Sequence, residues 1–128
     1  MDAINILLVE DEPLLRLDFE DALTQAGFTV TAVATIAAAE VTLASRSDWR
    51  GLVTDIRLEK GRSGWSLARV ARQTYPDLAI VYISGDSAGE WSAEGVPHSV
   101  MISKPFAISQ LITGVSHLLN SGETSHSS

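Results

Sequence analysis

Short apolar segments alternate along this chain with longer segments in which apolar residues recur every three or four positions. The short segments are rich in branched residues, which is typical of strands covered on both faces. They occupy residues 4–9, 28–33, 51–55, 79–84 and 99–103. The longer segments have helical spacing and occupy residues 12–26, 36–45, 65–75 and 107–119. The alternation predicts an α/β fold, a three-layer sandwich around a parallel sheet with right-handed crossovers.

Two segments lack this periodicity. Residues 85–97 hold three glycines and a proline among small polar residues, so any helix there is expected to be short and mobile. Residues 121–128 contain no apolar residue that could anchor them. We therefore expect one domain over residues 1–120 and a disordered tail over residues 121–128.

Composition removes several classes of function. The 128 residues suffice for one hydrophobic core, and 16 acidic against 9 basic side chains give a net charge of −7, which disfavours nucleic acid and anionic membrane as partners. Without cysteine there is no thiolate nucleophile and no cysteine-based zinc site. The first residues lack the basic region of a signal peptide, and no apolar run approaches the ~18 residues of a membrane span. A cytoplasmic protein is expected.

Polar side chains follow four of the five predicted strands. Glu10 and Asp11 follow the first strand, Asp55 ends the third, Ser84 ends the fourth and Lys104 follows the fifth. Because parallel strands end at the same edge of a sheet, we expect these side chains to meet there. Clustered carboxylates repel one another unless a cation lies among them, and oxygen ligands favour Mg²⁺, Ca²⁺ or Mn²⁺. Taken alone, Asp11 would better suit a cap of the following helix, and we expect it to cap that helix as well.

These residues, with Lys104-Pro105-Phe106 after the fifth strand, resemble the receiver domain of two-component response regulators. The resemblance covers residues 4–119, nearly the whole chain. It implies a flavodoxin-like, doubly wound (βα)5 fold with strand order 2-1-3-4-5. It also implies a phosphoacceptor signalling domain that catalyses only its own phosphorylation and dephosphorylation, rather than an enzyme.

The resemblance implies a role for each residue at the strand ends. Asp55 would accept the phosphoryl group from a histidine kinase or histidine phosphotransferase. Asp11 and Asp55 would ligate Mg²⁺ directly, Glu10 would do so through water, and the backbone carbonyl of Arg57 would complete the set. Neutralisation of charge by a metal and a lysine is what phosphoryl transfer requires from a protein.

The phosphoryl oxygens would be bound by Ser84 and Lys104, with a cis bond between Lys104 and Pro105. Many receivers carry an aromatic residue three positions before the lysine that moves inward on activation. Here that position is Met101, so we expect Ser84 and Met101 to form a switch of a different kind, since methionine repacks readily. The loop at residues 56–64 lacks the proline often found there and is about one residue longer than usual.

Two groups of residues concern partners. Leu14 and Leu17 lie off the core stripe of the first helix, next to Asp11, and either dock the phosphodonor or pad a neighbouring helix. Only nine residues follow the last predicted helix, so we expect output through another protein. That output is either a phosphorylation-dependent surface on the fifth strand, the last helix and residues 85–97, or a shuttle or sink for phosphoryl groups. We expect a monomer or a weak dimer.

Three alternatives compete with this interpretation. Gly85-Asp86-Ser87-Ala88-Gly89 matches the serine-hydrolase elbow and would need Glu94 with His98 or His117. Against it, no second oxyanion loop is evident and the chain is short. A haloacid-dehalogenase-type phosphatase would need an aspartate at Arg57. A flavodoxin-like phosphate site would lie at Glu10–Glu12, whose carboxylates repel phosphate.

Overall fold

Five parallel strands form one sheet in the order β2-β1-β3-β4-β5. The computed structural model describes residues 3–58, 63–85 and 91–127. The strands are β1 (Asn5–Val9), β2 (Thr29–Val33), β3 (Trp49–Asp55), β4 (Ala79–Ser84) and β5 (Ser99–Ser103). The doubly wound architecture and the strand order predicted from the sequence are confirmed.

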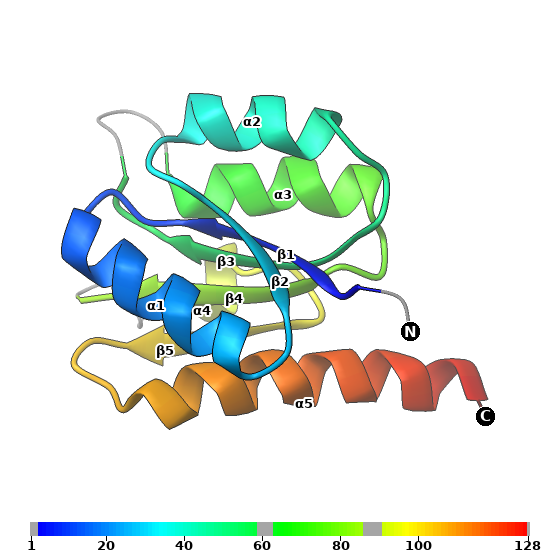
Figure 1. The fold of residues 1–128 in the computed structure, drawn as a ribbon. Helices are drawn as coiled ribbons and strands as arrows, with labels where there is room; N and C mark the ends of the chain where they lie inside the picture. The colour runs from blue at the N-terminus through cyan, green and yellow to red at the C-terminus, as the bar shows by residue number, and fades with distance from the viewer. Residues whose placement is uncertain (1–2, 59–62, 86–90, 128) are drawn as a thin grey trace.

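Helices cover both faces of the sheet (Figure 1). They are α1 (Pro13–Gln25), α2 (Ile36–Ala44), α3 (Gly64–Thr74), α4 (Trp91–Glu94) and α5 (Ile108–Ser127). Helices α2 and α3 lie on one face and α1 and α5 on the other, which gives the three layers. The four-residue α4 is as short as its glycine-rich surroundings predicted. Among the described residues, no helix is long and apolar enough to cross a membrane.

Alternate residues of each strand enter two separate cores. In β1, Leu7 and Val9 pack toward α2 and α3, whereas Ile6 and Leu8 pack toward α1 and α5, and all four are fully buried. Burying one such side chain stabilises the fold by about 1.5–3 kcal/mol. The strands are therefore held firmly, and so are the residues at their ends.

Two boundaries differ from the sequence prediction by more than one residue. β3 begins two residues early, at Trp49, because this side chain is buried and its indole N–H donates to the Leu43 carbonyl. The backbone of α5 remains helical to Ser127, although the apolar periodicity ends at Leu119. The backbone hydrogen bonds of a helix do not require apolar side chains, so the apolar periodicity does not detect helical turns that consist of polar residues. The division into residues 1–120 and a disordered tail stays a prediction.

The helix caps also correct one expectation. Thr35 caps α2 by accepting from the Ala38 N–H at 3.0 Å, and Ser63 caps α3 as part of a capping box with Ser66. The N-cap of α1 is Glu12, not Asp11, and its side chain makes no capping bond. The Glu12 N–H is instead bound by the side chain of Glu10 at 3.1 Å.

Candidate functional site

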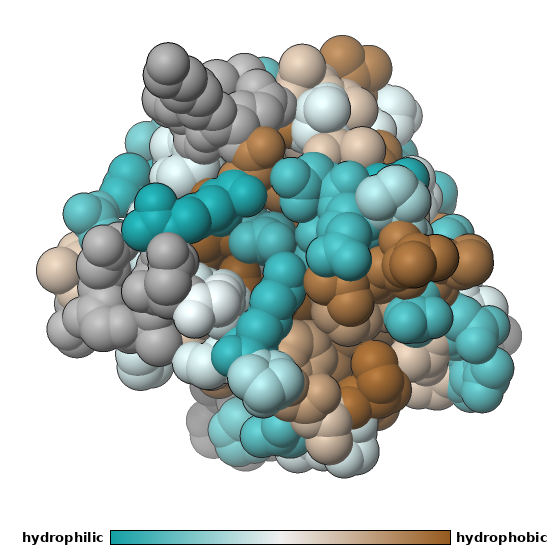
Figure 2. Space-filling model, turned by 90° about the vertical axis from the view of Figure 1, so that its left-hand side faces the viewer, coloured by the Kyte–Doolittle hydropathy of each residue, from teal (hydrophilic) through white to brown (hydrophobic). Residues whose placement is uncertain are grey.

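The four strand ends bring the residues singled out in the sequence to one edge of the sheet. The pairing of β1 with β3 and of β3 with β4 places the chain after Val9 beside Asp55, and Ser84 pairs with Ser103, next to Lys104. Figure 2 looks onto this edge, where hydrophilic residues gather across the centre and apolar residues lie beside them. The structure brings Glu10, Asp11, Asp55 and Lys104 together at this edge, and Ser84 ends the neighbouring strand.

Three carboxylates form a cluster at this edge. One oxygen each of Glu10, Asp11 and Asp55 lies within 4.8 Å of the others. Glu10 and Asp55 are buried, while Asp11 is exposed to solvent. The cluster is thus buried on the side of Glu10 and Asp55 and open to solvent on the side of Asp11, from which an ion or a phosphoryl group can approach.

Lys104 provides the one ammonium group described in contact with this cluster. Its Nζ donates to Asp55 Oδ2 at 3.0 Å and lies 3.4 Å from Glu10 Oε1. Burial lowers the pKa of Lys104, but the hydrogen bond and charge of Asp55, together with the charge of Glu10, outweigh it, so the pKa is raised. Its backbone N–H donates to the Ser84 carbonyl at 2.7 Å, and the Lys104–Pro105 bond is cis, as the resemblance implied.

One lysine does not neutralise the cluster. Burial raises the pKa of Glu10 to about 7. The Glu12 N–H lowers it, the Asp55 charge raises it, and Lys104 lowers it again. A carboxyl group that titrates near neutrality in the absence of a further cation lies in a site suited to hold one. Three carboxylates within reach of one point are the hard oxygen ligands that Mg²⁺ prefers, so the donor set fits this ion.

Asp55 and Glu10 are held in place by contacts that the sequence did not reveal. Its Oδ1 accepts from the Arg57 N–H at 3.2 Å. The first residue of α3, Gly64, lies so close that a Cβ there would be 2.4 Å from the Asp55 carbonyl oxygen. Arg16, one turn into α1, donates to the Glu10 carbonyl at 3.0 Å. For the contact of Gly64, the one signal in the sequence was a glycine at the junction of a loop and a helix. Nothing in the local sequence indicated the contact of Arg16.

The residues predicted to switch lie in two environments. Ser84 is buried at the end of β4. Met101 is half-buried and packs on the α2–α3 side of the sheet, and it pairs in register with Tyr82. Residues 59–62 lie outside the described residues, so the predicted lengthening of this loop is not described either.

Leu14 and Leu17 are exposed, at 71% and 62% of their surface. The idea that they pad a neighbouring helix of this chain is therefore wrong. Next to them, a cavity of about 390 Å³ is lined by Leu15, Phe19 and the segment Lys104–Phe106. It reaches from α1 to the lysine of the cluster.

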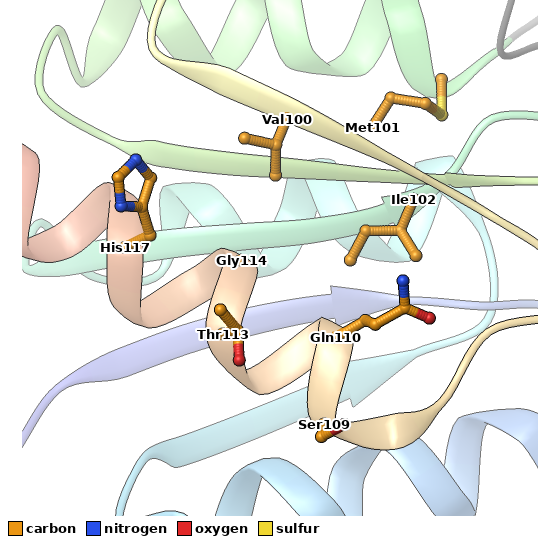
Figure 3. A pocket seen from close by; sticks show the side chains of 8 residues that line it. All are labelled: Val100, Met101, Ile102, Ser109, Gln110, Thr113, Gly114 and His117. Atoms are coloured by element: carbon orange, nitrogen blue, oxygen red, sulfur yellow. The ribbon is translucent and has the colours of Figure 1, made fainter.

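The hydrolase alternative finds no support among the described residues. Ser87 lies outside them. Glu94, its required acid, forms an ion pair with Arg69 instead of contacting a histidine. His117 lies on α5 beside Val100, on the face of the sheet opposite to α3 (Figure 3).

The molecule is a doubly wound α/β domain with three carboxylates and one lysine at the carboxyl edge of its sheet, and this arrangement is the one expected of a receiver-type signalling domain. The sequence matches the family model of the response regulator receiver domain over residues 6–116. The chain therefore belongs to the receiver-domain family of two-component signalling.

Relatives of known sequence or structure agree with this family. A response regulator receiver protein from Sinorhizobium medicae superposes with a TM-score of 0.90 at 52% identity, covering 94% of this chain and 98% of that one. The receiver protein CpdR of Brucella abortus is 33% identical over 89% of this chain and 95% of its own length. The phyllosphere-induced regulator PhyR of Methylorubrum extorquens is 30% identical over 91% of this chain. The chain spans 44% of PhyR.

Proposed function

We propose that this receiver accepts a phosphoryl group on Asp55, in a Mg²⁺-dependent reaction, from a histidine kinase or a histidine phosphotransferase. The observation that carries the proposal is the geometry around Asp55. One carboxylate oxygen is bound by Lys104 at 3.0 Å, and two further carboxylates lie within 4.8 Å.

In the proposed transfer, an oxygen of Asp55 forms a bond to phosphorus while the bond between phosphorus and the donor's imidazole nitrogen breaks. The electron pair of that bond stays on the imidazole, and the product is an acyl phosphate. Lys104 would turn from the carboxylate to the phosphoryl oxygens, where its charge opposes the developing negative charge. The hydroxyl of Ser84, which is buried at the neighbouring strand end, would donate to a second phosphoryl oxygen.

Glu10, Asp11 and Asp55 would hold the metal ion, with the backbone carbonyl of Arg57 as a further ligand. A bound Mg²⁺ supplies charge neutralisation and a fixed geometry for the transferred group. Arg57 already donates its N–H to Asp55, which places its backbone at the site.

The phosphodonor would dock on the α1 surface. Leu14 and Leu17 project beside Asp11, and the cavity between α1 and Phe106 continues this apolar area toward Lys104. Leu14→Ala is expected to slow transfer from the phosphodonor without changing the melting temperature or the uptake from acetyl phosphate. An unchanged rate of transfer from the donor contradicts this docking role.

Output would use β5 and α5. A groove of about 370 Å³ lies between them, with Val100 and Ile102 on one side and Thr113, Gly114 and His117 on the other (Figure 3). A downstream protein that binds there would make the chain a signalling receiver, whereas a shuttle or sink would exchange phosphoryl groups without such binding. A cytoplasmic location and a monomer or weak dimer stay predictions.

Intact-mass spectrometry tests the central proposal. The wild type and Asp55→Asn are incubated with acetyl phosphate, with and without Mg²⁺. We expect the mass of one phosphoryl group to be added in the wild type with Mg²⁺ only. The same gain in Asp55→Asn, or a gain without Mg²⁺, contradicts the proposed acceptor or the proposed metal.

A further inference from the structure

The segment Trp91–Ser99, here named the α4–β5 segment, is held by a small set of polar contacts. The Val96 N–H donates to the hydroxyl of Tyr82 at 3.1 Å. Trp91 Nε1–H donates to Ser99 Oγ at 3.2 Å, and Ser99 Oγ donates in turn to the Val96 carbonyl. Tyr82 is fully buried in the centre of β4, so its hydroxyl is a fixed point to which this segment is attached.

Helix α3 holds the same segment at further points. Arg72 donates to the carbonyls of Pro97 and His98 at 2.7 and 3.1 Å, and also to that of Leu78 at 2.6 Å. Arg69 forms an ion pair with Glu94. His98 has a φ of +61°, a left-handed conformation that residues other than glycine rarely adopt. The guanidinium of Arg72 therefore holds a backbone that is not in its preferred conformation.

The other end of α3 rests against the phosphoacceptor. The Gly64 N–H donates to the Ile56 carbonyl at 2.8 Å, and the space for a Cβ at Gly64 is filled by the backbone of Asp55 and Ile56. The next residue, Trp65, packs against Tyr82 with ring centroids 4.4 Å apart. An α-helix of 11 residues is ~16 Å long, so one rigid element spans from Asp55 to the α4–β5 segment.

Position 101 offers no comparable contact. Met101 packs with the apolar residues of the α2–α3 core and has no N–H or O–H group on its side chain. In the same region, the buried indole N–H of Trp65 finds no acceptor among the described residues. An unsatisfied buried donor disfavours the arrangement it is in. Trp65, Tyr82 and Arg72 thus carry polar groups that can make or break hydrogen bonds, whereas the side chain of Met101 does not.

We propose that α3 links the Asp55 site to the α4–β5 segment in this chain, with Arg72 and Tyr82, rather than Met101, as the residues that hold the segment. The inference rests on the proposed phosphorylation of Asp55. The contacts described here belong to the free carboxylate, because both oxygens of Asp55 are engaged, by Lys104 and by the Arg57 N–H. In this proposal the hold on the segment belongs to the same arrangement as these Asp55 contacts, so weakening it favours the phosphorylated arrangement.

The test measures how tightly the Asp55 site binds a phosphoryl mimic. Beryllium fluoride is titrated into the full chain with Mg²⁺ and followed by ¹⁹F NMR. Coupling between two sites is reciprocal, so we expect Arg72→Gln and Tyr82→Phe each to bind the mimic at least about threefold more tightly than the wild type. Amide hydrogen exchange at Val96 reports loosening of the segment in the same samples.

Three matched variants separate coupling from a general loss of packing. Tyr75→Phe also removes a tyrosine hydroxyl, one that donates to the carbonyls of Leu43 and Arg46 at the far end of the sheet. Arg46→Gln also removes a guanidinium, one that is paired with Asp48 on the surface. These two and Met101→Ala are expected to bind the mimic with wild-type affinity.

Each outcome decides the proposal. Unchanged or weaker binding in both Arg72→Gln and Tyr82→Phe overturns it, as does a change in Met101→Ala of the same size. If Arg72→Gln fails to fold, Tyr82→Phe alone decides. A wild type that binds no beryllium fluoride at Asp55 overturns the proposed function together with this link. A wild type that binds it while the variants do not differ overturns the link alone.

Discussion

The two edges of the sheet differ in the partners of their polar side chains. At the carboxyl edge, Glu10 and Asp55 are buried side by side with one lysine between them, and the pKa of Glu10 is raised to about 7, first by its burial. At the amino edge, Arg72 and the hydroxyl of Tyr75 bind backbone carbonyls, which need no charge compensation. At the carboxyl edge, buried carboxylates repel one another beside a single lysine. At the amino edge, hydrogen bonds to backbone carbonyls connect the turns between the strands and helices.

Gly64→Ala gives the largest expected effect, because it disturbs the carboxyl edge directly. The added Cβ would lie 2.4 Å from the Asp55 carbonyl oxygen. Because this oxygen belongs to the backbone of β3, relieving the clash requires a shift of the main chain. We expect a loss of about 1–3 kcal/mol in the free energy of unfolding and a fall of at least about tenfold in uptake from acetyl phosphate.

Gly114→Ala on α5 is the matched control. There a Cβ would meet Val100 and Ile102 side chains at 3.4 and 3.5 Å, which are close to ordinary contacts. Alanine is favoured over glycine inside a helix by roughly 0.5–1 kcal/mol, so this variant should be no less stable than the wild type. Equal stability and uptake in both variants would contradict the close approach of α3 to Asp55.

Glu10→Gln is the second prediction, and it separates function from stability. The amide keeps the shape of the side chain but removes a charge whose burial the fold disfavours. In the absence of divalent ions at pH 8, we expect urea unfolding to show a gain of about 1 kcal/mol. The same variant should lose most of the Mg²⁺-dependent uptake.

The exposed Glu40→Gln on α2 serves as its control, with no gain expected in stability. If Glu10→Gln is less stable than the wild type, then the contact with Lys104 contributes more than the burial of the carboxylate costs.

Tyr75→Phe addresses the amino edge. It removes a hydroxyl that lies 2.8 Å from the Leu43 carbonyl and 2.9 Å from the Arg46 carbonyl. The expected cost is about 1 kcal/mol in the free energy of unfolding, measured by urea denaturation. Uptake from acetyl phosphate should remain at the wild-type rate, and a lowered rate would show that the two edges are not independent at this point.

The same contrast explains what the sequence could reveal. Glu10, Asp55 and Lys104 were found because each follows an apolar run, and parallel strands end at one edge. Two features were not found: the close approach of Gly64 to Asp55, and the hydrogen bonds of Arg72 to five backbone carbonyls, those of Tyr75, Pro76, Leu78, Pro97 and His98. They join residues that are distant in the chain and lie outside any periodic pattern. Asp11 was expected to cap α1 from its position alone, but the neighbouring Glu10 side chain took the N–H of Glu12.

The smallest expected effect concerns His98 at the amino edge. Burial, and then the charge of Arg72, lower the pKa of this imidazole, while Asp77 opposes them. Between its lowered pKa and the ordinary value of about 6.5, the unfolded chain binds more protons than the folded one. The free energy of unfolding is therefore highest above the ordinary pKa of histidine, and it decreases as the pH falls from that value through the lowered pKa of the folded state.

His98→Asn should flatten this dependence. Asparagine tolerates the left-handed conformation of residue 98 and carries no titrating group. Urea unfolding at pH 8 and pH 5.5 should differ less in the variant than in the wild type, by a few tenths of a kcal/mol. His117→Asn, which removes an exposed imidazole on the other face of the sheet from Arg72 (Figure 3), serves as the control. An equal pH dependence in His98→Asn and the wild type would mean that the guanidinium of Arg72 does not act on this imidazole, and that it serves only to bind the carbonyls around it.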